Sequence, residues 1–162
     1  MLADDKEFIN FKVHTQYSIC EGAIKIDELA DYCKKNKVKA IGLADSFNLC
    51  GALEFAEKIS KIGTQPLIGT QINLLCNNEI GKVTLYATSE KGYQNLTKLS
   101  SLSYFKNKNA YDPHCEINDL ILNNEDIILL TGSYNNFFGK LFYANKEKYF
   151  EQIIEKLKSS FQ

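Results

Sequence analysis

Two apolar segments near the N-terminus each end on side chains that could bind a metal ion or move a proton. Phe11–Gly22 reads FKVHTQYSICEG, in which a short apolar run reaches His14 and a polar turn continues to Glu21. Gly42–Phe55 begins with a second apolar run that ends on Asp45. Histidine and carboxylate groups serve in metal ligation and in general acid–base catalysis. In barrel-type α/β folds the C-terminal ends of the strands build the site, so these side chains are expected to lie together.

Each of these residues also has a structural interpretation that involves no chemistry. A lone histidine at a strand end is usually structural, which is the alternative for His14. Glu21 precedes Gly22 at the start of a helix, where an acid favours the helix dipole. Asp45 could cap the helix that follows its strand. The residue types alone leave both interpretations open at all three positions.

The cysteines and the second histidine give weaker signals. The chain has five cysteines, an odd number without a C-x-x-C pair, which indicates reduced thiols in a cytoplasmic protein. Cys20 and Cys50, near the candidate residues, are expected to be small buried side chains rather than nucleophiles. His114 lies beside Cys115 in a polar stretch and is expected at the surface.

The elements that would position these side chains follow from the hydrophobic pattern. Apolar residues at spacings of three and four predict helices, and compact apolar runs predict buried strands. The resulting β-α-β-α-β order favours a parallel sheet with helices outside it. The expected elements of this first half are strand Phe8–His14, helix Ile26–Asn36, strand Val38–Asp45, helix Gly51–Ile62 and strand Pro66–Leu75.

The second half is predicted to begin with a small antiparallel element. Cys76–Lys82 is expected to connect a hairpin whose second strand is Val83–Ala87. A closed α/β barrel usually needs about 250 residues, so the chain is expected to form an open portion of one. The remaining predictions are helix Glu90–Phe105, polar loop Lys106–Pro113, helix Ile117–Leu122, a parallel-type strand Asp126–Thr131, and helices Phe137–Tyr143 and Glu147–Phe161.

The composition excludes several classes of protein. The chain of 162 residues is 44% hydrophobic, which is enough for a core, and its net charge of −1 argues against a strongly basic nucleic-acid surface. It contains no arginine, so bidentate guanidinium contacts to phosphate or guanine are not possible. No signal peptide, membrane span, Walker loop or G-x-G-x-x-G motif is present. The residues alone indicate a cytoplasmic α/β domain without assigning it a reaction.

Several segments, in order, resemble the PHP (polymerase and histidinol phosphatase) domain that begins the alpha subunit of bacterial DNA polymerase III. They are FKVHTQYSICEGAIKIDEL, AIGLADSFNLCGALEFAEK, QPLIGTQINL, VTLYATSEKGYQNLTKLSS and DIILLTGSYNNFFGKL, and the likeness runs from Phe8 to Phe161. The phrases NLCGALEF and GYQNLTKL are typical of the replicative polymerase branch. The resemblance implies a PHP-type distorted β/α barrel, TIM-like and truncated, with a small antiparallel hairpin.

The resemblance also implies a domain organisation. Residues 1–162 would be a partial PHP domain whose barrel is incomplete at the C-terminus, and the palm, thumb and fingers of the polymerase would be absent. An incomplete barrel leaves a strand edge and some apolar surface uncovered. A soluble but aggregation-prone or partly molten product is therefore expected.

Set against the family pattern, most of the metal site is lost. Active members open with His-x-His, which falls on Lys12 and His14, and Glu21 stands where the family usually has aspartate. In the Asp-His-Gly motif Asp45 is kept, and Phe47 stands at the glycine. The other vestigial positions are Ser46 for histidine, Gln71 for glutamate, Lys82 for histidine and Ser133 for cysteine.

The resemblance therefore predicts no catalytic residue and no bound metal, with His14 and Glu21 as the best remaining metal donors. A charged lysine has no lone pair and repels a divalent cation. Lys12 is expected to pair with Glu21 or Asp45 and to replace the lost metal charge. Zn or Mn would bind only to an active PHP site, and Mg would belong to the parent polymerase.

Three functions are weighed on this basis. The preferred one is a non-catalytic structural and subunit-docking module of a parent DNA-directed DNA polymerase, a part of the DNA replication machinery. Its expected partners are the remainder of the alpha subunit and the proofreading exonuclease subunit, with DNA bound only through the parent protein. The alternative is a metal-dependent PHP phosphoesterase or 3′–5′ proofreading exonuclease. The third is an unrelated α/β domain with an accidental likeness.

Overall fold

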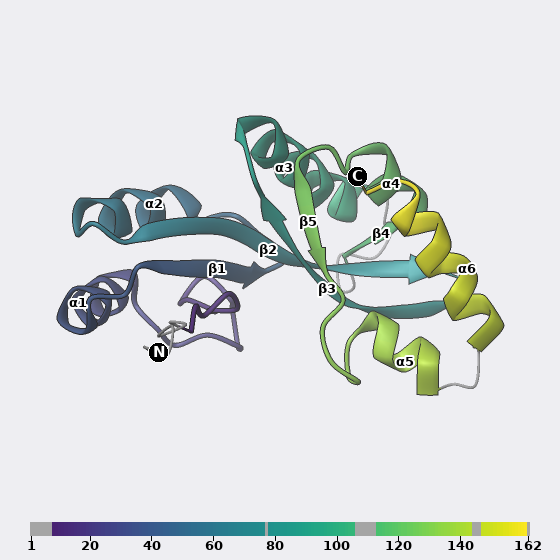
Figure 1. The fold of residues 1–162 in the computed structure, drawn as a ribbon, viewed down its shortest axis with the longest axis horizontal. Coiled ribbons are helices and arrows are strands. Elements are labelled where there is room, and N and C mark those ends of the chain that lie inside the picture. Colours follow the sequence, from purple (N-terminus) through teal and green to yellow (C-terminus); the bar gives the residue numbers. More distant parts are fainter. Residues whose placement is uncertain (1–7, 77, 106–112, 144–146, 162) are drawn as a thin grey trace, which may run out of the picture.

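The computed structural model describes residues 8–76, 78–105, 113–143 and 147–161. These residues form a five-stranded mixed sheet with helices packed along its length, and the longest dimension of the molecule follows the sheet (Figure 1). The predicted α/β class and the antiparallel hairpin are therefore confirmed.

The sheet is built around its longest strand, β2 (Gln65–Cys76). β1 (Ala40–Ser46) runs parallel to the first half of β2, and β4 (His114–Glu116) runs parallel to its last residues. β3 (Glu79–Ala87) pairs antiparallel with β2 and, at its other edge, with β5 (Ile127–Leu130). β1 and β4 thus follow one another along one edge of β2, while β3 occupies the opposite edge.

The helices divide into two groups along the sheet (Figure 1). α1 and α2 lie at the end formed by β1, and the later helices surround the end formed by β3, β4 and β5. Most of the predicted helix bounds are confirmed to the residue, and the second and last helices are slightly shorter than predicted. The observed bounds are α1 Ile26–Asn36, α2 Ala52–Lys61, α3 Glu90–Phe105, α4 Ile117–Leu122, α5 Phe137–Tyr143 and α6 Glu147–Lys158.

Two hydrophobic clusters correspond to these two groups. One joins α1 and α2 to β1 around the fully buried Phe55. The larger one joins β2 and β3 to the later helices and includes Leu85 and Phe137, both fully buried. Leu49, in the loop before α2, packs against both clusters. The two clusters are therefore connected by the packing of Leu49 and also by β2, which contributes side chains to both.

The predicted strand Phe8–His14 is wrong as a regular strand. Its residues run beside β1, but only a single ladder contact forms, between Val13 and Leu43. The Gly42 amide donates to the Asn10 carbonyl at 2.8 Å, and the Val13 amide donates to the Gly42 carbonyl at 3.1 Å. A Cβ on Gly42 would lie 2.3 Å from the Phe11 carbonyl oxygen, so this close approach of two backbones requires a glycine.

The second half departs from prediction at three strands. β3 begins at Glu79, so the predicted connection Cys76–Lys82 is wrong and most of it is strand. β4 was not predicted, because three residues are too few to show a hydrophobic period. β5 runs in the same direction as β2, as expected, but its partner is the antiparallel β3. The predicted loop Lys106–Pro113 lies outside the described residues except for its last residue.

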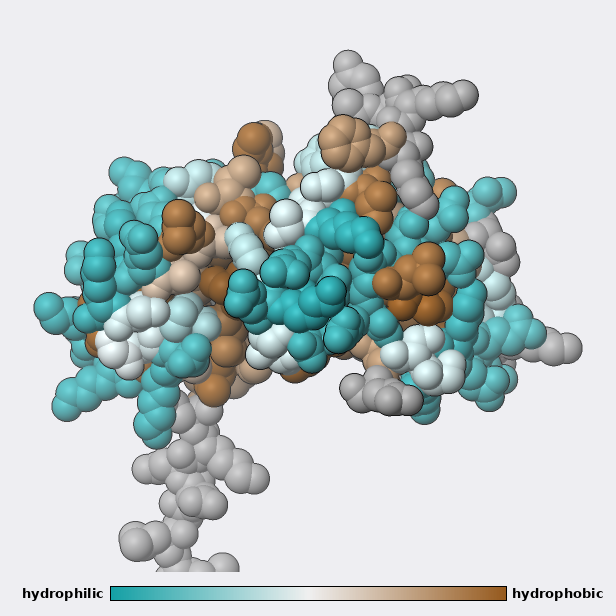
Figure 2. Space-filling model, turned by 90° about the horizontal axis from the view of Figure 1, so that it is seen from above, coloured by the Kyte–Doolittle hydropathy of each residue, from teal (hydrophilic) through white to brown (hydrophobic). Residues whose placement is uncertain are grey.

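The surface shown in Figure 2 is mostly hydrophilic, with apolar side chains in separate patches. Large apolar side chains with high exposure include Ile19, Phe105 and Leu122, which lie on different elements. Among the described residues, none of the helices combines the length and apolar character needed to cross a bilayer.

Candidate functional site

A polar network forms where the turn after His14 folds over the C-terminal end of β1. The turn is compact because the amides of Glu21 and Gly22 both donate to the Ser18 carbonyl, at 3.0 and 2.8 Å. After the turn the chain runs back beside the start of the turn, where the Gln16 amide donates to the Ile24 carbonyl at 2.9 Å. We call this the strand-end network and define it by Thr15, Ser18, Glu21, Asp45, Ser46 and Lys82.

Asp45 is the centre of the network. The residue is 0% exposed, and its carboxylate faces the turn, where it contacts Thr15 and Ser18. Oδ1 accepts the Thr15 amide and the Ser18 hydroxyl, both at 2.6 Å, and Oδ2 accepts the Thr15 hydroxyl at 2.7 Å. A buried carboxylate is stable only when such donors replace its hydration shell. Asp45 therefore holds the turn in place, and its predicted role as a helix cap is not what its side chain does.

Ser18 connects Asp45 to the neighbouring positions. While its hydroxyl donates to Asp45, the same oxygen accepts the Ser46 amide at 3.0 Å. The Nδ1 atom of His14 lies 3.4 Å from this oxygen, at the limit of a hydrogen bond. Ser18 is fully buried, so its hydroxyl serves as a structural link and is not accessible as a nucleophile.

An ion pair closes the network on the side of the hairpin. The Lys82 ammonium, from β3, contacts Oε1 of Glu21, and the Ser46 hydroxyl donates to Oε2 of the same carboxylate. The Ser46 oxygen also lies 3.5 Å from Oε1 of Gln71, whose amide donates to the Thr84 hydroxyl at 3.0 Å. Both Glu21 oxygens are thus engaged by donors from β1 and β3.

Phe47 stands directly after this network in a backbone conformation that is unusual for a bulky residue. Its φ is 63°, in the left-handed region that favours glycine. Two hydrogen bonds with residues distant in the sequence stabilise this conformation. The Phe47 amide donates to the Gln71 carbonyl at 2.8 Å, and the Tyr104 hydroxyl donates to the Phe47 carbonyl at 3.1 Å. The Lys82 ammonium lies 5.2 Å from the centroid of the Phe47 ring, a cation–π distance.

The surroundings of His14 and Glu21 lower the pKa of both side chains. Burial, helped by the nearby Lys12 charge, lowers the pKa of His14 below its ordinary 6.5, so the imidazole is favoured in its neutral form. The hydrogen bond from Lys82, and then that from Ser46, lowers the pKa of Glu21 below its ordinary 4.5. At neutral pH the site therefore holds a neutral imidazole beside an ionised carboxylate.

The salt bridge that was predicted for Lys12 is made by Lys82 instead. Lys12 is exposed, and among the described residues no ion pair joins it to Glu21 or Asp45. The reason is position: Lys82 lies on β3, next to the strand that carries Gln71, and its ammonium reaches Glu21. The predicted position Ser133 is exposed and follows β5, and no described contact joins its side chain to the network.

Three other sequence expectations are corrected. Cys20 and Cys50 are exposed, not buried, because both lie in turns that face solvent. His114 lies in β4 rather than in a surface loop, and its side chain is half-buried. Its neighbour Cys115 is fully buried in the larger hydrophobic cluster. None of these residues belongs to the strand-end network.

The donors present do not suit a divalent cation. In the part of the chain that the structure describes, no three His, Cys, Asp or Glu side chains are placed to hold a metal ion. The Asp45 oxygens already accept three protein hydrogen bonds, and Glu21 is neutralised by the Lys82 ammonium. An ammonium at this point would also repel the ion. The network is therefore complete as a hydrogen-bonded structure without a metal.

Sequence reasoning missed the residues that satisfy Asp45. Thr15 and Ser18 provide all three donors to its carboxylate, yet neither residue type is unusual in a turn. One signal was available: an acid buried at a strand end requires donors, and the turn after His14, at the end of the neighbouring apolar segment, carries hydroxyl side chains. The partnership of Glu21 with Lys82 spans 61 residues and had no local signal.

The sequence of the chain is similar to one family of domains and to several named proteins. The sequence profile of the family described as PHP domain matches residues 10–162. Over 143 residues the chain is 38% identical to DNA polymerase III subunit alpha of Rickettsia felis, which covers 88% of this chain and 12% of that protein. Over 172 residues it is 32% identical to DNA polymerase III subunit alpha of Aquifex aeolicus, covering 96% of this chain and 15% of that protein. The chain thus spans a small part of the length of these relatives.

Among solved structures, the chain is similar to an amidohydrolase from Chromobacterium violaceum. The TM-score is 0.45 at 16% sequence identity, and the match covers 58% of this chain and 34% of that one.

Proposed function

The chain belongs to the PHP domain family, and we propose that it is a non-catalytic PHP module of a DNA polymerase III alpha subunit. In this role it supports the polymerase core and offers a docking surface to other subunits. The parent protein would catalyse DNA-templated DNA synthesis with Mg, and this domain would take part in that reaction only through its contacts. The similarity to alpha subunits over most of the chain supports the assignment to this protein.

One observation carries the non-catalytic role: the Lys82 ammonium contacts Glu21 at the strand ends, where a metal-dependent member needs open carboxylate oxygens. A catalytic metal site keeps an open coordination position and ligands with available lone pairs. Here Asp45 is fully occupied by local donors. The ion pair and hydrogen bonds supply the cohesion that a metal cluster would otherwise supply.

The test is metal analysis of the purified 162-residue chain, combined with phosphatase and 3′–5′ exonuclease assays in Mn and Zn. We expect no stoichiometric metal and no turnover above a blank. Stoichiometric metal together with turnover would overturn the proposal and establish the phosphoesterase or exonuclease alternative.

A reconstructed variant serves as the positive control for this test. Lys12→His, Ser46→His, Gln71→Glu and Lys82→His together restore four of the five lost donor types of the active family pattern, all except the cysteine at Ser133. We expect this variant to bind Mn or Zn, whereas the unmodified 162-residue chain does not. If the variant and the unmodified chain bind metal equally, the loss of metal-binding side chains does not govern metal binding, and the proposal fails.

The docking role is tested separately. The chain is mixed with the proofreading exonuclease subunit of its own organism and analysed by size-exclusion chromatography with light scattering. Joint elution supports the docking surface, whereas separate elution contradicts it. The metal measurement is independent of this result, so the two halves of the proposal can fail separately.

A further inference from the structure

β5 has one edge that no strand covers in the part of the chain that the structure describes, because β5 ends the strand order of the sheet. On its covered side, the Thr88 amide donates to the Asp126 carbonyl at 2.9 Å, in register with the ladder between β3 and β5. Backbone groups of an antiparallel strand point alternately to one side and to the other. The amide and carbonyl of Leu129, three residues further on, therefore point toward the uncovered edge.

An apolar groove of about 440 Å³ lies between β5 and α6. β5 lines it with Ile127 and Leu129, and α6 lines it with Ile154 and Phe161. Lys158 of α6 brings a charge to the same groove. A chain segment that pairs with β5 therefore also meets this flank of α6.

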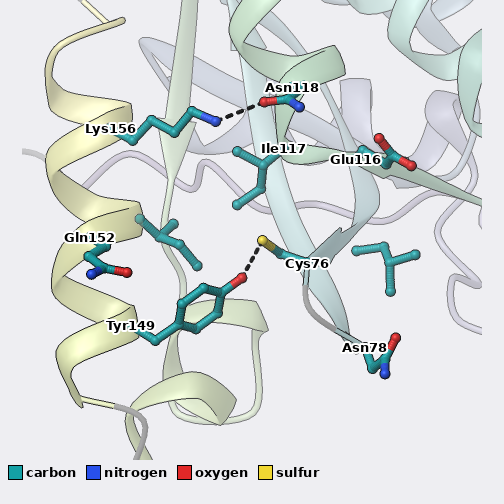
Figure 3. Close-up of a pocket in the computed structure, with 10 residues that line it drawn as sticks. Cys76, Asn78, Glu116, Ile117, Asn118, Tyr149, Gln152 and Lys156 are labelled. Carbon is teal, nitrogen blue, oxygen red and sulfur yellow. Dashed lines mark hydrogen bonds between the residues drawn. The ribbon is translucent and has the colours of Figure 1, made fainter.

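The opposite flank of α6 is attached to the rest of the molecule. The Tyr149 hydroxyl contacts the Cys76 sulfur at the end of β2, and the Lys156 ammonium donates to Oδ1 of Asn118 at 2.8 Å (Figure 3). These contacts fix the rotation of α6 about its own axis. The flank that borders the groove is therefore presented in one orientation.

The groove flank of α6 carries a charge pattern that is complementary to itself. Glu151, Ile154 and Lys158 follow one another at spacings of three and four, so they form one stripe with the isoleucine in the middle. Glu151 and Lys158 are exposed, and neither forms an ion pair with another described residue. When two such stripes meet in opposite directions, each Glu151 lies opposite a Lys158 and the two Ile154 side chains meet.

We propose that the chain forms a twofold-symmetric dimer through β5 and α6. The two β5 strands pair antiparallel, and the amide of each Leu129 donates to the Leu129 carbonyl of the other copy. The paired strands join the two sheets and place both α6 helices on the same face, where Glu151 of each copy pairs with Lys158 of the other. Because a twofold interface makes every contact twice, one self-complementary stripe supplies two ion pairs.

Other occupants match this surface less well. A second copy bound in the parallel direction would place Glu151 opposite Glu151 and Lys158 opposite Lys158, which is unfavourable. A strand of unrelated sequence would use the Leu129 backbone groups but would leave both charges of the stripe without partners. The charge pattern therefore selects a second copy of this chain in the antiparallel orientation.

The test is sedimentation velocity of the full 162-residue chain from about 5 to 500 µM. We expect a monomer–dimer equilibrium with a Kd on the order of 10–100 µM, which weakens as salt screens the exposed ion pairs. A chain that stays monomeric throughout would show that the edge takes a different occupant, and it would overturn the proposal. Growth beyond the dimer would also overturn it, because a twofold interface is closed.

Charge-reversal variants test the stripe itself. Lys158→Glu and Glu151→Lys each place like charges opposite one another at two points, so each should weaken the dimer about fivefold or more. The double variant exchanges the two charges and should return the Kd to within about twofold of that of the unmodified chain. A general effect of surface charge or stability would not be repaired in this way. If the double variant is no tighter than the single ones, the proposal is overturned.

Matched controls make the same changes of net charge elsewhere. Lys98→Glu on α3 and Glu57→Lys on α2 alter exposed residues away from the stripe and should leave the Kd unchanged. If these variants weaken the dimer as much as Lys158→Glu and Glu151→Lys do, the proposal is overturned.

Hydrogen exchange of the unmodified chain covers the case in which a variant does not fold. Raising the concentration through the Kd should slow the exchange of the Leu129 amide, because its donor becomes paired across the interface. The amides of α1 should exchange at the same rate at both concentrations. Concentration-dependent protection confined to segments other than β5 and α6 would place the interface elsewhere and would overturn the proposal.

Discussion

Asp45 is the residue on which the strand-end network depends most. Its carboxylate is fully buried and receives three hydrogen bonds from Thr15 and Ser18. Asp45→Asn would turn an amide N–H₂ toward these donors and leave at least one of them unsatisfied. We expect a loss of about 2–4 kcal/mol in the free energy of unfolding, measured by urea denaturation.

Asp31→Asn on the exposed side of α1 is the matched control, since the same chemical change there should cost less than about 0.5 kcal/mol. Equal losses in the two variants would show that the Asp45 hydrogen bonds do not stabilise the fold.

The ion pair between Lys82 and Glu21 should make a smaller contribution. The two side chains are 32% and 38% exposed, so solvent screens their attraction. Lys82→Met keeps the apolar stem and removes the charge, the contact with Glu21 and the cation–π contact with Phe47. A loss of about 1 kcal/mol is expected, whereas Lys91→Met at the looser 4.0 Å pair with Glu125 should cost a few tenths.

Stability should fall as the pH is lowered, in two steps. The folded pKa of His14 lies below its ordinary 6.5, so the unfolded chain binds the proton more strongly and stability decreases as the pH drops through and below 6.5. The folded pKa of Glu21 lies below its ordinary 4.5, so its contribution is present above that pH and is lost as the pH falls through the folded value.

Urea denaturation across this pH range checks both steps. His14→Gln should flatten the upper step and leave the lower one, and Glu21→Gln should do the reverse. If the free energy of unfolding of the unmodified chain is constant from pH 7 to pH 5, the assignment of the upper step to His14 is wrong.

At this scale the sequence named several of the positions that meet, although Lys12 and Ser133 are not among them, and it did not indicate how the positions interact. Asp45, Ser46, Glu21 and Lys82 were named as one vestigial site, and the structure brings them together. The partner of Glu21 was assigned to the neighbouring Lys12 because nothing local ranks a lysine on a distant strand above one nearby. Such pairings depend on sheet register, which a single sequence does not specify.

At the scale of elements, long periodic segments were predictable and short or irregular ones were not. α3 (Glu90–Phe105) has an apolar stripe over several turns, and its bounds matched. Phe8–His14 is apolar enough to read as a strand, yet it forms only an isolated contact with β1. Its hydrogen bonds with Gly42 and Ala44 form one bridge rather than a continuous ladder, and no hydrophobic period reports that difference.

The Gly42 approach gives an element-scale prediction. Gly42→Ala places a methyl group 2.3 Å from the Phe11 carbonyl oxygen, a backbone atom that cannot rotate away. The N-terminal segment must separate from β1, at a cost of about 1–3 kcal/mol in urea denaturation.

Gly63→Asn is the control for this substitution. Gly63 has open space around it, and asparagine tolerates its φ of 81° better than other residues. A Gly42 variant as stable as this control would show that the segment is not held closely against β1.

At the scale of the whole molecule, β5 is one edge of the sheet formed by the described residues. It ends the strand order of the described residues, and its sequence IILL carries no charge or proline that would oppose pairing with another chain. Ile128 is 48% exposed on this strand. We expect concentration-dependent self-association in light scattering, and Ile128→Lys should reduce it by placing a charge on the edge.

Ile24→Lys, at a similarly exposed isoleucine away from the edge, should leave the association unchanged. If both variants reduce it equally, general surface charge and not strand pairing is responsible.

The central part of β2 has a consequence for how the molecule opens. Residues 69–71 pair with β1 on one edge and β3 on the other, and residues 73–75 pair with β4 and β3. We expect their amide protons to be among the slowest to exchange with deuterium, because this stretch is paired on both edges and has no free side from which to fray. Because β2 places Ile68 against the smaller hydrophobic cluster and Ile72 and Leu74 in the larger one, we expect the domain to have a single slow-exchanging spine along this strand, so that the two halves open together.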